Sequence, residues 1–271
     1  MKRLYYILII IGTISCQLNY NQKEFQNENV SISRELIGTW GLSNYLDSII
    51  IKKEVAKYRL QSPSWFGILL EVSEDSIISY GSIIEIEAGL LNKRDTLAIL
   101  DSWVGKWMLL QKQNKLLLKQ FPNQEDVDTT IYIYNKRDDL KGMTEDLSII
   151  HKISSNMTKF LNEEIISGTY LNQKTNTKVE FLKNGELNGI DDFTEYEVRN
   201  YFGTLHLHKN LDVLFLKNKT EGLVKQYNWK FEGDNLVLTE FKNETIERNG
   251  KDVMTDYFVL GKEIIDLKKE D

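Results

Sequence analysis

Short β-patterned segments separated by tight turns run through the chain from residue 35 onward, and they limit the fold more than any other feature. Asn184-Gly185 and Asn249-Gly250 are dipeptides that readily accept the two positive φ values of a type I′ hairpin turn. Tight turns between sequential strands predict an antiparallel meander, and closing a meander into a barrel removes its exposed edges. In the second half the pattern covers residues 178–182, 186–188, 196–202, 204–208, 212–216, 226–231, 235–241, 245–248 and 253–259.

The first half carries the same kind of segments less regularly, and one helix is expected among them. Its pattern starts at Ser43 or Asn44 and runs to about Tyr58, with Leu46 and Ile49 on the buried side. Strand-like segments follow at residues 66–72, 76–86, 96–100, 103–110, 116–121 and 129–134.

A second amphipathic helix is expected between the halves, from about residue 145 to 162. Thr144 is a candidate N-cap, and apolar residues then recur at three- and four-residue spacing. The sequence therefore predicts a mainly β protein of two antiparallel meander barrels with one or two amphipathic helices. The apolar positions of the expected helix are Leu147, Ile150, Ile153, Met157, Phe160 and Leu161.

The first sixteen residues have the pattern of a secretory signal. Lys2 and Arg3 precede a mostly apolar run from Leu4 to Ile14, which leads to Cys16. A helix needs roughly 20 apolar residues to span a bilayer, so this run is too short for a permanent anchor. We expect it to be removed.

Ser15 followed by Cys16, the only cysteine, resembles the lipobox of bacterial lipoproteins, although Thr13 stands where leucine is commoner. The resemblance implies that Cys16 is lipidated and becomes the new N-terminus, which anchors the protein without a spanning segment. Gln17 stands where aspartate would retain a lipoprotein at the inner membrane, so the resemblance favours the outer membrane of a bacterial envelope. The alternative is an ordinary signal peptide with an incidental cysteine.

These features divide the chain into six expected parts. The length of 271 residues suits about two domains of typical size. The parts are a signal peptide (1–15), a lipidated flexible tether (16–34), an N-terminal β-rich domain (35–142), a linker helix (143–164), a C-terminal barrel domain (165–266) and a charged tail (267–271).

Two related motifs open the two halves. Leu36-Ile-Gly-Thr-Trp40 begins the first half, and Ile166-Ser-Gly-Thr-Tyr170 begins the second 130 residues later. The Gly-Thr-Trp triplet resembles the Gly-x-Trp entry of lipocalin-like barrels. In the second half, Val179–Gly185 and Trp229–Leu238 are similar to segments of small lipocalin-like domains in bacterial lipoproteins. The resemblance implies a β barrel and leaves the function open, because small barrels serve ligand binding, inhibition and scaffolding alike.

Composition excludes several classes of function. The net charge of -6 has the wrong sign for a nucleic-acid-binding surface, so no nucleic-acid partner is expected. One cysteine excludes a disulfide framework and a cysteine-based metal site. The chain has no phosphate-binding or dinucleotide-binding glycine motif and no Gly-x-Ser-x-Gly elbow. We expect no cofactor and no catalytic residues.

Three sets of residues are candidates for a site. Trp65, Trp103 and Trp107 can line an apolar cavity for a lipid or stack on a sugar, or they can simply fill a barrel. His206 and His208 are candidate metal ligands because alternate residues of a strand share a face, and a solvated outer face is the alternative.

Carboxylate pairs form the third set, which the hydrolase alternative requires. Glu85 with Glu87 and Asp191 with Asp192 can do acid–base work at a glycosidic bond, although among 40 acidic residues such pairs also arise by chance.

The expected function is binding of a small apolar or glycan ligand by a membrane-anchored, non-catalytic envelope lipoprotein. One alternative is a structural or partner-docking lipoprotein with a packed core. A second alternative is a metal- or carboxylate-dependent hydrolase. The expected partners are therefore a membrane, reached through the lipid, together with a small ligand or an envelope protein.

Overall fold

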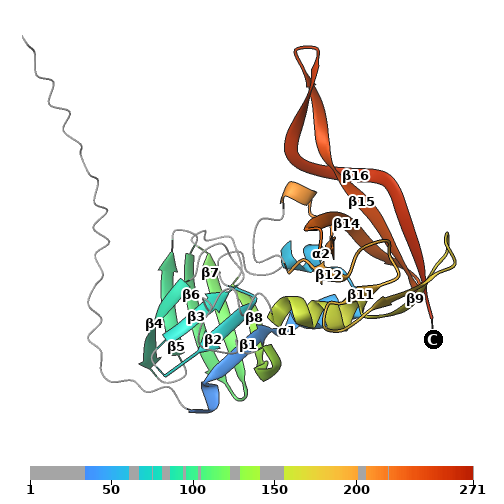
Figure 1. Cartoon of the computed structure of the whole chain (residues 1–271). Coiled ribbons are helices and arrows are strands. Elements are labelled where there is room, and N and C mark those ends of the chain that lie inside the picture. Colours follow the sequence, from blue (N-terminus) through green and yellow to red (C-terminus); the bar gives the residue numbers. More distant parts are fainter. Residues whose placement is uncertain are drawn as a thin grey trace, which may run out of the picture. The chain divides into compact units, whose positions relative to one another are not determined.

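The computed structural model describes residues 34–60, 67–74, 76–80, 86–93, 96–102, 105–122, 129–140, 156–200, 206–218 and 220–270. They belong to one compact unit, Ser31–Asp271. Two antiparallel sheets make up most of this unit, so the expectation of a mainly β protein built from meanders is confirmed (Figure 1). The signal segment, Cys16 and the linker residues 143–155 lie outside the described residues.

The first sheet is a closed barrel of eight strands in sequence order. Each strand pairs with the next, and the last strand pairs back with the first through Gly41↔Asn135 and its neighbours. Alternation of buried and exposed side chains supplies the core: Leu116, Leu118 and Tyr134 are fully buried. The strands are β1 (Gly38–Leu42), β2 (Leu69–Val72), β3 (Ser76–Tyr80), β4 (Ile86–Lys93), β5 (Thr96–Ser102), β6 (Gly105–Lys112), β7 (Lys115–Pro122) and β8 (Thr130–Lys136).

The helix expected over residues 44–58 is divided into two. α1 (Ser43–Lys52) ends where Lys53 adopts a φ of 54°, and the Lys53 N–H is donated to the Ile49 carbonyl. α2 (Val55–Leu60) follows after one further residue. Leu46 and Ile49 are buried as expected, because this face of α1 packs against the barrel.

The second sheet repeats the meander with eight further strands. Its first strand pairs with both its second and its last strand, as in the first sheet. Its two edge strands are joined by a single bridge, Glu186↔Glu195. The strands are β9 (Gly168–Asn172), β10 (Lys178–Phe181), β11 (Leu187–Asn188), β12 (Glu195–Val198), β13 (Val213–Asn218), β14 (Leu223–Glu232), β15 (Asn235–Arg248) and β16 (Lys251–Lys269).

The two sequence motifs occupy the same place in the two sheets. In each sheet a glycine with positive φ, Gly38 at 136° or Gly168 at 151°, opens the first strand. The aromatic residue two positions later then donates a buried hydrogen bond to the carbonyl four residues before it. Trp40 Nε1 lies 2.9 Å from the Leu36 oxygen, and Tyr170 Oη lies 2.8 Å from the Ile166 oxygen. Tyrosine therefore replaces tryptophan with its hydrogen bond preserved.

Short helical turns precede these strands or follow the barrel. η1 (Arg34–Leu36) leads into β1, and η2 (Asp138–Leu140) follows β8. Residues 156–161 are α-helical, in the C-terminal part of the expected linker helix, and η3 (Asn162–Ile166) continues them as a π-helix up to β9. Met157 and Leu161 are fully buried, as their spacing predicts.

Three local expectations are wrong. Residues 206–208 form the 3₁₀ turn η4 (His206–His208) instead of ending a strand at 204–208. The charged tail assigned to 267–271 begins inside β16, because Leu267 is buried and residues 267–269 pair with β9. At Asn184-Gly185 only Gly185 has a positive φ, so this turn is not type I′, whereas Asn249 and Gly250 both have one.

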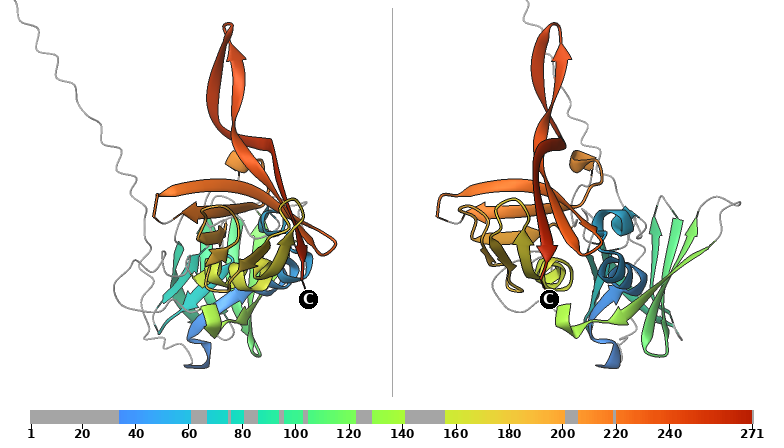
Figure 2. Two further views of the ribbon diagram at one scale, coloured as in Figure 1. Left: turned by 45° about the vertical axis from the view of Figure 1, so that its right-hand side comes forward. Right: turned by 90° about the vertical axis from the view of Figure 1, so that its right-hand side faces the viewer.

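β15 and β16 continue far beyond the rest of the second sheet. β14 pairs with β15 only as far as Tyr227↔Glu240, and β9 pairs with β16 only from Leu267 onward. Residues 241–264 therefore form a two-stranded hairpin, which we call the arm, and its tip extends beyond β14 in three views (Figure 1, Figure 2).

Candidate functional surfaces

Aromatic side chains fill the interior of the second sheet. Phe181 makes edge-to-face contacts with Tyr170 and Tyr196 at centroid distances of 5.6 and 5.0 Å. Tyr227 and Trp229, on β14, are also fully buried. These rings form a packed core on this sheet.

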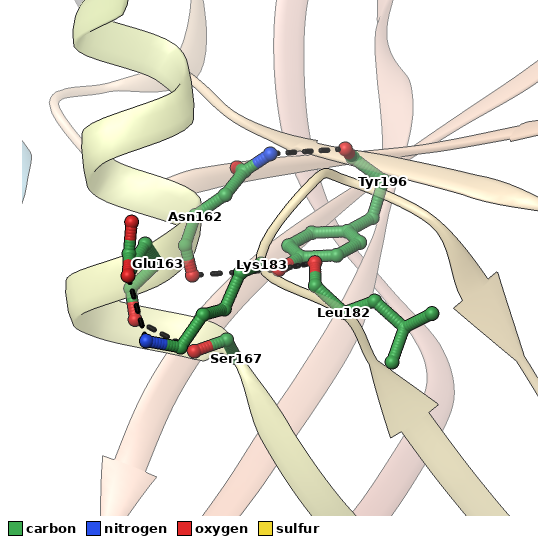
Figure 3. A network of polar contacts seen from close by, with 6 residues as sticks. All are labelled: Asn162, Glu163, Ser167, Leu182, Lys183 and Tyr196. Atoms are coloured by element: carbon green, nitrogen blue, oxygen red, sulfur yellow. Dashed lines mark hydrogen bonds and ion pairs between the residues drawn. The ribbon is translucent and has the colours of Figure 1, made fainter.

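A polar network holds the edges of the second sheet together (Figure 3). The hydroxyl of Tyr196, on β12, donates to the Leu182 carbonyl at 2.8 Å. Asn162, the first residue of η3, accepts from the Val198 N–H at 2.8 Å and donates to the Tyr196 carbonyl at 3.4 Å. Lys183 pairs with Glu163 at 2.6 Å on the same turn. Burial raises the pKa of Tyr196, so this hydroxyl remains a hydrogen-bond donor at neutral pH.

A hollow of 460 Å³ lies beside this network and carries charges of both signs. Glu186 and Glu195 face one another across the bridge, while Glu197 pairs with Lys217. The described residues contain no group of three or more histidine, cysteine, aspartate or glutamate side chains placed to hold a metal ion. This hollow therefore lies where the backbone bridge closes the sheet and where an ion pair links β12 to β13.

Among the carboxyl groups that the structure describes, Asp212 has the pKa that is shifted most from its ordinary value. One of its oxygens, Oδ1, accepts the N–H groups of Val55 and Ala56 at 3.0 and 2.7 Å, and thereby binds the start of α2. Burial raises the pKa of Asp212 from 3.8 to about 7, against the opposing effect of those two hydrogen bonds.

The surroundings of Asp212 indicate a structural role. A hollow of 320 Å³ adjoins it, lined in part by Lys52, Lys57 and Lys230. Lys57 pairs with Glu54 at 2.6 Å, and Lys230 pairs with Glu232. Sequence reasoning did not find Asp212, since its partners lie more than 150 residues away along the chain.

His206 and His208, the two candidate metal ligands, do not lie on a strand. The 3₁₀ geometry of η4 removes the shared face that the prediction required. The alternative prediction, a solvated outer face, is also wrong for His208, because this residue is only 3% exposed. Its Nδ1 lies 2.7 Å from Arg199 Nη1, and its Nε2 lies 2.5 Å from Gln226 Oε1. Burial lowers the pKa of His208.

Of the three candidate tryptophans, Trp107 lies within the described residues, and Trp65 and Trp103 lie outside them. Trp107 is buried in the first barrel and stacks on Tyr132 at a centroid distance of 6.5 Å. The ligand site expected from the three residues stays a prediction.

Of the two candidate carboxylate pairs, the structure describes one in full. Asp191 and Asp192 are exposed in the turn after β11, Glu85 lies outside the described residues, and only the backbone of Glu87 is described, in β4.

The arm carries the largest group of exposed apolar side chains in the second sheet. Its base is fixed, because the ring of His208 stacks on Phe258 at 4.4 Å and meets Phe241 edge-on at 4.9 Å. The apolar side chains of the arm that are exposed by 39 to 69% are Ile246, Val253, Met254, Tyr257, Leu260 and Ile264.

Comparison with models of protein families, with characterised proteins and with solved structures gives no match for this chain. Among helices formed by the described residues, none has the length and apolar character needed to cross a membrane.

Proposed function

We propose that this chain is a lipid-anchored lipoprotein of the bacterial envelope whose β scaffold presents the arm to a protein partner. The observation that carries the proposal is the set of exposed apolar side chains on a hairpin outside the core. Apolar side chains clustered on a projecting element are typical of interaction sites, since water contact with them is relieved on binding.

The filled interior of the second sheet favours docking over ligand binding. Tyr170, Phe181 and Tyr196 pack edge to face with one another on the inner side of this sheet. The closed meander of the first sheet and the Gly-Thr-Trp entry at Trp40 support kinship with lipocalin-like barrels. In this proposal the barrel architecture is retained as a rigid support.

The anchor is proposed on the residues of the N-terminus. The basic start, the short apolar run and Ser15-Cys16 support lipidation at Cys16, and Gln17 supports sorting to the outer membrane. A polar tether over residues 17–34 would give the folded unit a reach of about 20 to 25 Å from the headgroups.

A photo-crosslinking residue at Met254 tests the docking role in intact cells. Met254 is 69% exposed on the arm, and Ile51, on α1, is 72% exposed and serves as a matched control. We expect a probe at Met254 to yield a defined crosslinked protein band and a probe at Ile51 to yield none. Equal yields from both positions, or no product from Met254, would contradict the docking role.

The anchor is tested by fractionation of cells that express the Cys16→Ser variant. Because a serine hydroxyl cannot take the thioether-linked lipid, we expect the variant to move from the membrane fraction to the soluble fraction. The Ser15→Ala variant keeps a small residue before Cys16 and should stay with the membranes. If Cys16→Ser sediments with membranes as the parent does, the anchor is somewhere else.

A further inference from the structure

The base of the arm lies where the pairing of β15 and β16 is irregular. The register shifts between Thr239 and Phe241 and again between Asn243 and Thr245. Such an irregularity interrupts the hydrogen-bond ladder and bends the strand that carries it. Because the ladder is interrupted on both sides of Phe241, side-chain contacts at the base help to set the direction of the arm.

The side chain of His208 provides these contacts from outside the hairpin. Its ring stacks on Phe258 of β16 at a centroid distance of 4.4 Å, with 5° between the ring planes, and meets Phe241 of β15 edge-on at 4.9 Å. Lys209, the next residue, pairs with Glu244 of β15 at 2.6 Å, but a partly exposed ion pair contributes little. His208 is therefore the residue that joins η4 to both strands of the arm.

The contacts of the two ring nitrogens show which protonation state His208 has in this arrangement. A guanidinium group can only donate, so Nδ1, which lies 2.7 Å from Arg199 Nη1, must be the acceptor. The ring proton is then on Nε2, which donates to Gln226 Oε1 at 2.5 Å. The bound ring is therefore neutral.

A second proton on His208 would be poorly accommodated. It would lie on Nδ1 and point at the guanidinium of Arg199, which carries a like charge and has no acceptor. The face of Phe258 attracts a cation, but a parallel ring cannot accept an N–H that lies in the plane of the imidazole. Residues 201–205, which precede η4, contain no aspartate or glutamate that could accept this proton. Burial lowers the pKa of His208, and Arg199 lowers it further, against the opposing effect of the hydrogen bond to Gln226.

The carboxylates on the elements around the ring do not offset this effect. Glu244 of β15 pairs with Lys209, and Glu197 of β12 pairs with Lys217 of β13. Asp256 of β16 makes no hydrogen bond to either ring nitrogen. Arg199 is therefore the charged group that acts most directly on the ring.

We propose that His208 is an acid-sensitive contact, which holds the base of the arm at neutral pH and releases it when Nδ1 is protonated. This inference rests on the proposed docking role of the arm and adds its regulation. Release of the ring removes its contacts with Phe241 and Phe258. The arm is then free to bend at its irregular base, so acidification weakens the fixed presentation of exposed side chains such as Met254.

The direction of the effect follows from the two states of the ring. A released, solvated histidine has a pKa of about 6.5, and the bound ring has a lower pKa. Well above pH 6.5 both states are neutral and the contact is fully stable. Below this pH the released ring takes up a proton and the bound ring does not, until the pH reaches the pKa of the bound ring. The equilibrium constant for release should therefore rise by up to about ten-fold for each pH unit below about 6.5.

Hydrogen exchange of the purified full-length chain, measured by mass spectrometry at pH 7.5 and pH 5.5, tests this contact. The protection factor, which is the intrinsic exchange rate divided by the observed rate, removes the direct effect of pH on exchange. We expect the protection factors of the backbone amides at residues 241–244 and 256–260 to fall about ten-fold at pH 5.5. Those of residues 227–232, where β14 pairs with β15, should not fall.

Two substitutions at His208 remove the titrating group in different ways. Glutamine in His208→Gln offers one acceptor and a donor, as the neutral ring does, and phenylalanine in His208→Phe keeps an aromatic ring for the stack. Each variant should have the same protection factors at the two pH values, even where the base of the arm is looser than in the parent. His206→Gln removes the other histidine of η4 and should respond to pH as the parent does.

Variants at two further residues separate the charges involved. Asp212→Asn removes the carboxyl group whose pKa is raised to about 7, and the ten-fold fall should persist in that background. Arg199→Gln removes the positive charge beside Nδ1, so the pKa of the bound ring rises towards that of the released ring and the fall becomes smaller. Arg199→Lys keeps the charge and should retain most of the fall.

The Met254 photo-crosslink at the same two pH values separates this inference from the docking role. We expect acidification to lower the yield at least three-fold in the parent and to leave it unchanged in His208→Gln. Protection factors that do not fall in the parent, or that fall equally in His208→Gln, would overturn the acid-sensitive contact and leave the docking role to the crosslink. A fall in protection that depends on His208, with no Met254 crosslink at either pH, would remove the docking role and leave the contact standing. The same fall with an unchanged crosslink would overturn the regulation.

Discussion

The Gly189→Ala variant is expected to lose about 3 kcal/mol or more of unfolding free energy, a large effect for the addition of one methyl group. Gly189 follows β11 and has a φ of 89°, which alanine adopts only with strain. A Cβ atom at this position would lie 2.0 Å from the carbonyl oxygen of Lys178, the first residue of β10. Because that oxygen belongs to the backbone, the clash is relieved only if the two strands move apart.

Gly233→Ala is the matched control for this prediction. Gly233 also has a positive φ, 63°, but no atom lies within 4 Å of the position of its missing Cβ. Its substitution therefore carries the backbone strain alone, worth about 1 to 2 kcal/mol. Thermal unfolding of the purified chain, followed by circular dichroism, measures both variants. Equal midpoints for the two would show that β10 and β11 are not held as closely as described.

The parts of the fold that depend on local chemistry were predictable from the sequence. Asn249 and Gly250 take the two positive φ values of the expected turn. Trp40 and Tyr170 occupy equivalent positions because each motif carries its own glycine and its own hydrogen-bond acceptor four residues earlier. In both cases the determining contacts lie within a few residues of one another.

The parts that depend on distant contacts were not predictable. Leu205-His-Leu-His208 alternates like a strand, yet His208 is drawn into a turn by Gln226 and Phe258. Asp212 looks like an ordinary surface carboxylate until α2 is placed against it. The arm has the alternation of a half-buried strand, and its exposure follows only from where β14 and β9 stop pairing with β15 and β16.

We expect Asp212 to make the stability of the protein depend on pH between about pH 4 and pH 7. Burial raises its pKa from 3.8 to about 7 in the folded chain. Below pH 4 the group is protonated in both the folded and unfolded states. Between pH 4 and pH 7 the unfolded chain releases the proton while the folded chain retains it, so stability falls by roughly 1.4 kcal/mol per pH unit. Above pH 7 both states are ionised and the loss is complete.

The Asp212→Asn variant isolates this contribution. An asparagine side-chain oxygen can still accept the N–H groups of Val55 and Ala56, and it carries no charge at any pH. As the pH rises from 5 to 8, we expect the unfolding free energy of the variant to increase by roughly 2 to 3 kcal/mol relative to that of the parent. The reason is that only the parent must ionise a buried carboxyl group. Denaturant unfolding at a series of pH values measures the difference.

Asp192→Asn provides the control, because Asp192 is an exposed carboxyl in a turn. It measures, under the same conditions, what the replacement of an exposed aspartate by asparagine does to unfolding. Glu54 also raises the pKa of Asp212, so Glu54→Gln should shift the fall in stability of the parent to lower pH without abolishing it. If the difference between Asp212→Asn and the parent does not change with pH, Asp212 is hydrated in solution, and its two backbone hydrogen bonds do not hold α2 in the buried contact described.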